Sequence, residues 1–107
     1  MDIAPVNPGH TLVISKKHFA NIEETPEDVL CQVISAVKKV GRAIKDSLGV
    51  EGYNININND PVAGQVIPHL HFHIIPRHSG DRLKLWEQGE YKEGEAENMA
   101  KNIKSGF

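Results

Sequence analysis

Apolar positions recur at two different periods along the chain, and the period changes near residue 52. Between Pro26 and Gly49 they follow three- and four-residue steps, which predicts one long helix whose single apolar face covers a sheet. Thr25 suits the N-cap, Pro26 the first helical position and Gly49 the C-terminal stop. The apolar positions of this helix are Val29, Leu30, Val33, Ile34, Val37, Val40, Ile44 and Leu48.

Three segments have the pattern of strands. Residues 10–14 are rich in β-branched side chains and follow a Pro-Gly turn, which predicts a strand with one buried face. From residue 53 Ile and Asn alternate, which predicts a half-buried strand with amides on its other face. Residues 66–76 are predicted to form a third strand, joined to the second by an open hairpin loop over 59–65. A short terminal helix is predicted around residues 95–103.

Length and composition limit the class of protein. A chain of 107 residues with 39% apolar and 24% charged side chains is expected to be a single domain, 1–107, of ordinary globular composition. Its net charge of -2 gives no general attraction to nucleic acid, and no apolar run is long enough to span a membrane. A lone cysteine, Cys31, excludes an intrachain disulfide and fits the cytoplasm.

Histidines are concentrated in residues 69–75, where three of the chain's six lie at alternate positions. On an extended backbone His69, His71 and His73 share one face, while the residues between them turn toward a core. Aligned imidazoles are typical of metal ligands. Alternatively, one ring can act as nucleophile or general base while its neighbours orient it and bind an anion. The simplest alternative is three histidines on a solvated sheet face.

The residues from His69 to Ile75 fit the signature His-φ-His-φ-His-φ-φ of the histidine triad family, where φ is apolar. Other segments resemble the family's marked motifs in the same order: Asp2-Ile3, residues 8–14, Lys16-Lys17-His18 and Ala63-Gly64-Gln65. The resemblance covers residues 2–81, leaves 82–107 as a C-terminal extension, and is to the bacterial-type nucleotide-binding hydrolases. It implies an α+β fold in which one long helix packs on an antiparallel sheet.

The resemblance also implies an activity: hydrolysis or transfer at the α-phosphate of a purine nucleotide, by a homodimer that needs no cofactor and no metal. His71 would attack phosphorus and form a nucleotidyl-histidine. The backbone carbonyl of His69 would accept the proton on the other ring nitrogen of His71. The remaining implied contacts are His73, His10 and Gln65 to phosphate oxygens or the leaving-group bridge, Asp2 to the ribose, Ile3 to the base, and Asn58 at the phosphate end.

Two departures from the family pattern bear on this expectation. Family members normally begin with a hairpin and short helix that supply part of the base pocket, and this chain starts at Met1, directly before the segment matching Asp2. Many members also place Ser or Thr where this chain has Val66, which predicts a different or weaker route for protonating the leaving group. Two alternatives therefore remain: a nucleotide-binding module with little turnover, and a metal-binding histidine cluster, against which the lack of a paired carboxylate argues.

Overall fold

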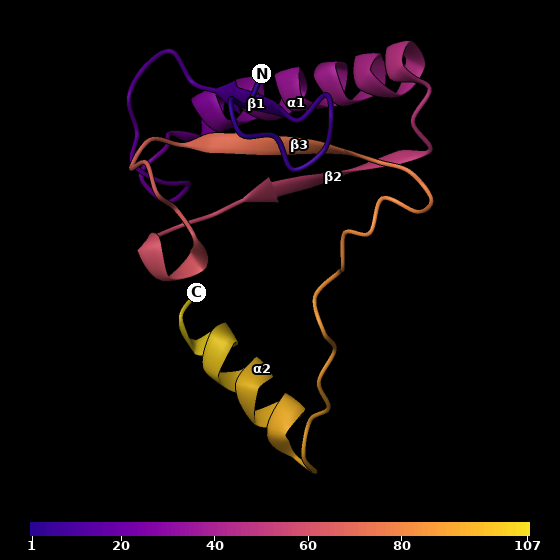
Figure 1. Ribbon diagram of the computed structural model, residues 1–107. Coiled ribbons are helices and arrows are strands. Elements are labelled where there is room, and N and C mark those ends of the chain that lie inside the picture. The colour runs from indigo at the N-terminus through magenta and orange to yellow at the C-terminus, as the bar shows by residue number, and fades with distance from the viewer.

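Three strands form one antiparallel sheet in which the last strand of the chain is central. The computed structural model describes residues 1–107, and the sheet order is β1-β3-β2. The elements are β1 (Thr11–Ile14), α1 (Glu27–Leu48), β2 (Gly52–Ile57), the short 3-10 helix η1 (Pro61–Ala63), β3 (His71–Arg77) and α2 (Glu95–Ser105). The predicted α+β class and the β2–β3 hairpin are confirmed (Figure 1).

Helix α1 covers one face of the sheet and encloses the core. Val33, Val37 and Ile44 of the helix pack with Leu70, Phe72 and Ile74, all of them buried. At Gly41 the helix meets the ring of Tyr53 on β2 so closely that a Cβ there would lie 2.7 Å from a ring carbon. The opposite face of the sheet has no helix packed on it, and the site is built on that face.

The ends of α1 follow the prediction in part. Gly49 ends the helix in the left-handed region at φ 62°, as predicted. The predicted N-cap was wrong by one residue, because Pro26 occupies that position and no side chain caps the helix. Thr25 instead donates its hydroxyl hydrogen to the carbonyl oxygen of Asn21 at 2.7 Å, which fixes the loop that enters the helix.

The central strand begins five residues later than predicted. Pro68 has no N–H to donate to a sheet, and the amide of Leu70 donates to the carbonyl oxygen of Phe19 in the loop after β1, at 2.7 Å. Pairing with β1 starts only at His71, opposite Ile14. His69 therefore lies before the strand, where the two-residue alternation of side chains no longer applies.

The end of β3 is fixed by an ion pair between Arg77 and Asp81. Arg77 contacts Asp81 at 2.6 Å and also donates to the side chain of Asn54 at 2.7 Å and to the carbonyl of Leu83 at 2.9 Å. The Arg77 guanidinium holds the pKa of the Asp81 carboxyl well below its usual range. This cluster joins the end of β3 to β2 and to the start of the C-terminal segment.

Beyond Leu83 the chain leaves the sheet. The predicted terminal helix is confirmed as α2, which contacts no other helix or strand and lies apart from the body (Figure 1). Trp86, on the segment leading to it, is 92% exposed. No helix in the chain combines the length and apolar character needed to cross a membrane.

Candidate active site

Two of the three clustered histidines lie on the open face of the sheet. His71 and His73 alternate on β3 with the buried Phe72 and Ile74, so the predicted alternation is confirmed for these positions. Their ring centroids are 4.8 Å apart and the rings are nearly perpendicular, at 68°. Because the strand is central in the sheet, both rings have a rigid backbone beneath them.

The ring of His71 is oriented by a backbone carbonyl. Its Nδ1 lies 2.7 Å from the carbonyl oxygen of His69, the contact that the family resemblance implied. A carbonyl oxygen only accepts hydrogen bonds, so Nδ1 of His71 carries the proton. In the neutral ring the other nitrogen, Nε2, holds the lone pair, and it has no hydrogen-bond partner within the chain. This is the tautomer a nucleophilic imidazole requires.

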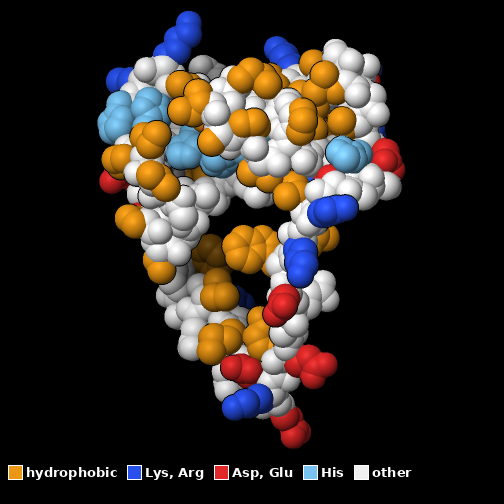
Figure 2. Space-filling view, in the orientation of Figure 1, with side chains coloured by type: hydrophobic (Ala, Val, Ile, Leu, Met, Phe, Trp, Pro, Cys, Tyr) orange, Lys and Arg blue, Asp and Glu red, His pale blue; other side chains and the backbone are white.

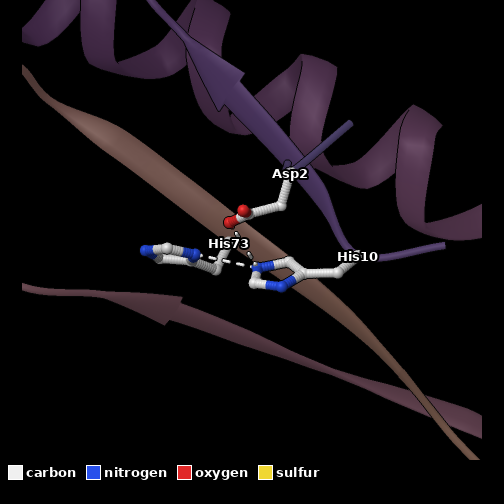
Figure 3. Close-up of side chains that lie close together, drawn as sticks. All are labelled: Asp2, His10 and His73. Atoms are coloured by element: carbon white, nitrogen blue, oxygen red, sulfur yellow. Dashed lines mark hydrogen bonds and ion pairs between the residues drawn. The ribbon is translucent and has the colours of Figure 1, made fainter. Parts of the chain in front are cut away.

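The ring of His10 lies behind His73 and is only 2% exposed. Its Nδ1 accepts a hydrogen bond from the backbone N–H of Val6 at 3.2 Å, and its Nε2 lies 2.9 Å from Nδ1 of His73. A carboxylate oxygen of Asp2 lies 3.7 Å from the same Nε2. Figure 3 shows the three side chains converging from the N-terminal segment and from β3. His10 thus contacts His73 directly, as a buried neighbour.

The group formed by Asp2, His10 and His73 has the spacing of a metal site, because one ligand atom from each lies within 4.8 Å of the others. To bind an ion through Nε2, His10 would have to move its proton to Nδ1. That move would set two N–H groups against each other and break the bond from Val6. The hydrogen bonds therefore favour a role in orienting His73 over a role in holding a metal.

The charges of this group are set by local contacts. The backbone N–H of Ala4 bonds to the Asp2 carboxylate at 2.9 Å and lowers its pKa, and His10 and His73 act in the same direction. The pKa of His73 is lowered because burial disfavours the charged ring, and the neighbouring His71 and His10 add to this. At neutral pH the site therefore combines an anionic carboxylate with a neutral His73.

The side chain of His69 points elsewhere. Its Nε2 lies 3.0 Å from the carbonyl oxygen of Ser15, and its Nδ1 lies 3.3 Å from Nδ1 of His18. The expectation that all three rings share one face is therefore wrong for His69. His18 was assigned no role from the sequence, although its place in the Lys16-Lys17-His18 motif was a signal that could have singled it out. Figure 2 shows several histidine side chains gathered at one side of the body and another at the opposite side.

The other predicted ligand-binding residues are bonded within the loops or exposed. Gln65 is 8% exposed; its Oε1 accepts from the backbone of Asp60 at 2.9 Å and its Nε2 donates to the carbonyl of Ala20 at 2.6 Å. Asn58 donates to the carbonyl of Gly64 at 3.4 Å. Ile3 is fully exposed. The structure places Gln65 and Asn58 as supports of the loop before β3, and their contacts with phosphate, like that of Ile3 with a base, stay predictions.

Comparison with known proteins agrees with the fold. Residues 1–80 match the HIT domain family. An uncharacterised HIT-like protein of Methanocaldococcus jannaschii is 48% identical over 97% of this chain and 79% of its own length. A HIT family protein of Bacillus subtilis has a crystal structure that superposes with a TM-score of 0.89 at 36% identity, over 100% of this chain and 79% of that one. The chain belongs to the HIT family.

A relative with a named activity is adenosine 5′-monophosphoramidase hnt1 of Schizosaccharomyces pombe, which is 44% identical over 72% of this chain. The match spans 55% of that enzyme, so this chain corresponds to about half of its length. The HIT family thus includes nucleotide hydrolases.

Proposed function

We propose that this protein is a nucleotide hydrolase or nucleotidyl transferase that cleaves at the α-phosphate of purine nucleotides through a covalent nucleotidyl-His71 intermediate. The observation that carries the proposal is the 2.7 Å contact between Nδ1 of His71 and the carbonyl of His69. It leaves the Nε2 lone pair free on the open face of a rigid central strand. An enzyme that relies on positioning needs its nucleophile held in this way.

In the proposed reaction Nε2 of His71 attacks the α-phosphorus. A P–N bond forms, the bond from phosphorus to the leaving group breaks, and the leaving group departs with its electron pair. Water then attacks the same phosphorus: a P–O bond forms, the water gives up a proton, the P–N bond to His71 breaks with its electron pair returning to Nε2, and the nucleoside monophosphate is released. Charge spreads over the equatorial oxygens during both steps, so an N–H donor beside His71 contributes most in the transition state. His73, 4.8 Å away between centroids, is placed to be that donor.

The remaining roles concern binding. We propose that the Asp2 carboxylate accepts hydrogen bonds from the ribose hydroxyls, because its lowered pKa keeps it anionic beside the imidazoles. Ile3, whose apolar side chain is fully exposed, would then pack against the base. Gln65 and Asn58 support the site by holding the loop that leads to His69.

The same proposal extends to the class of substrate, the oligomeric state and the cellular compartment. The name of the yeast relative supports adenosine phosphoramidates, and dinucleoside polyphosphates and adenylylated adducts present the same α-phosphate. The family resemblance supports a homodimer, and the lone cysteine supports a reducing compartment such as the cytoplasm.

The proposal is tested by incubating the protein with adenosine 5′-phosphoramidate and measuring AMP release. The mass of the intact protein is then measured by mass spectrometry after a quench without acid. We expect turnover, together with a mass increase of one AMP on the wild type. His71→Ala should abolish both. His78→Ala, which removes an exposed histidine outside the site, should change neither. Nucleotide binding without AMP release, unaffected by His71→Ala, would instead identify a binding module.

A further inference from the structure

We propose that His10 is a positioning residue that acts through His73: it holds the neutral ring of His73 in the tautomer whose proton is on Nε2. The sequence comparison with the family placed His10 at the phosphate. The structure places it behind His73, buried and bonded at both ring nitrogens. The catalytic meaning of this inference rests on the proposed function, whereas the tautomers themselves can be measured without any substrate.

The chain of hydrogen bonds begins at a backbone amide, whose direction is fixed. The N–H of Val6 can only donate, so Nδ1 of His10 must accept and cannot carry a proton. The neutral ring of His10 then has its proton on Nε2. That nitrogen lies 2.9 Å from Nδ1 of His73, which must accept in turn. His73, if neutral, therefore carries its own proton on Nε2.

At His71 the hydrogen bonding begins at a backbone carbonyl instead, and the ring is held in the opposite tautomer. Nδ1 of His71 donates to the carbonyl of His69, which leaves its Nε2 bare. Two adjacent rings on one strand are thus set to opposite tautomers, one by a backbone acceptor and one, through His10, by a backbone donor. The pair presents a lone pair for phosphorus and, beside it, an N–H for the oxygens that gain charge. The other tautomer of His73 would present a second lone pair and repel those oxygens.

The surroundings of His10 support this arrangement. At 2% exposure its nitrogens have no access to bulk water that could replace the bond from Val6. The carboxylate of Asp2, 3.7 Å from Nε2, stabilises a proton on that nitrogen. The charged and titratable groups around His73 are His71 on its own strand and Asp2 and His10 on the N-terminal segment. A proton added to Nδ1 of His73 would face the N–H of His10, so the same bond keeps His73 neutral.

The experiment is long-range ¹H–¹⁵N NMR of histidine-labelled protein without nucleotide, in which the two ring nitrogens report the tautomer. We expect a proton on Nδ1 in His71 and on Nε2 in both His10 and His73. The matched variants are His10→Gln and His10→Glu, which have nearly the same size. Glutamine can still donate to Nδ1 of His73, whereas an ionised glutamate can only accept. His78→Gln serves as the control for assignment.

For His10→Gln we expect the His73 tautomer to be retained and kcat to fall by no more than about tenfold. For His10→Glu we expect the proton of His73 to move to Nδ1, its pKa to rise, and kcat to fall on the order of 100-fold, the typical cost of one lost donor. KM should change little in both variants, because the donor acts mainly on the transition state. The NMR spectra of the wild type already report the tautomers of His10, His71 and His73. The inference can therefore be tested even if a variant does not fold.

A wild-type His73 with its proton on Nδ1 would overturn the inference, as would a His10→Glu protein that folds and keeps the His73 proton on Nε2. If the tautomers are as expected but the protein turns over no nucleotide, the series of hydrogen bonds is supported and the proposed function is contradicted. The two claims can therefore fail separately.

Discussion

Two groups of histidines lie near the start of β3, and they differ in what their nitrogens contact. In the first group, His71 and His73 lie on the open face of the sheet with the buried His10 behind His73; His71 and His10 bond to backbone groups, and His10 bonds to His73. His69 and His18 pair with each other and join the loop before β3 to the end of β1. Both groups contain the same type of side chain. Only the first group contains rings, those of His71 and His73, whose Nε2 has no partner within the chain and faces the open side of the sheet, and this separates a candidate catalytic group from a structural pair.

The largest expected effect is the difference in AMP release between His71→Ala and His69→Ala, two substitutions within the histidine motif. His71→Ala should reduce AMP release on the order of 1,000-fold or more, because it removes the nucleophile. His69→Ala should stay within about tenfold, because the carbonyl that orients His71 belongs to the backbone and survives the substitution. The comparison is made by measuring single-turnover rates for both variants. Thermal unfolding shows whether each variant is folded. Equal losses would show that the His69 ring itself belongs to the catalytic group.

A smaller effect is expected at Gln65, which belongs to neither group of histidines but holds the loop leading to both. Gln65→Ala leaves the amide of Asp60 and the carbonyl of Ala20 without partners, so we expect a loss of about 1–3 kcal/mol in the free energy of unfolding. Activity should fall less than in His71→Ala. Urea unfolding and AMP release measured on the same preparation test this. A large loss of activity at unchanged stability would instead place the amide on the phosphate.

The pH dependence of stability tests the half-buried ring of His73. Burial lowers the pKa of His73 from its ordinary value of 6.5, so below that value the unfolded chain takes up a proton that the folded protein does not. The free energy of unfolding should therefore fall as pH drops through 6.5 toward the folded pKa, and the cost should be absent at higher pH. His73→Gln should flatten this part of the curve. Identical slopes in the two proteins, measured by urea unfolding, would contradict the assignment.

The smallest effect is expected at His18. Its contact with His69 is long, at 3.3 Å, and exposed. His18→Ala should change the free energy of unfolding by less than about 1 kcal/mol and leave AMP release within about twofold, as expected for a ring that contributes no group to the transition state. Chemical denaturation and the same activity assay measure both. A large loss of activity would show that the two groups of histidines act together.

Local patterns predicted much of this fold because they report local physics. The three- and four-residue steps of α1 and the alternation along β2 and β3 record which side chains face the core, and the core confirms them. The predicted start of β3 was wrong because the N–H of Leu70 bonds to the carbonyl oxygen of Phe19, which lies 51 residues earlier in the sequence. The Arg77–Asp81 cluster was missed for a similar reason, since Asn54 and Asn7 complete it from distant segments.

The sequence by itself determined which residues form the motif, which face of the central strand carries His71 and His73, and which family the chain resembles. These follow from side-chain period and residue type, which depend on near neighbours. Only the tertiary structure decided that His69 turns away, that His10 lies behind His73 and that His18 pairs with His69. Those contacts join loops far apart in sequence, where no period relates one side chain to another and only the packed chain fixes the direction of each ring.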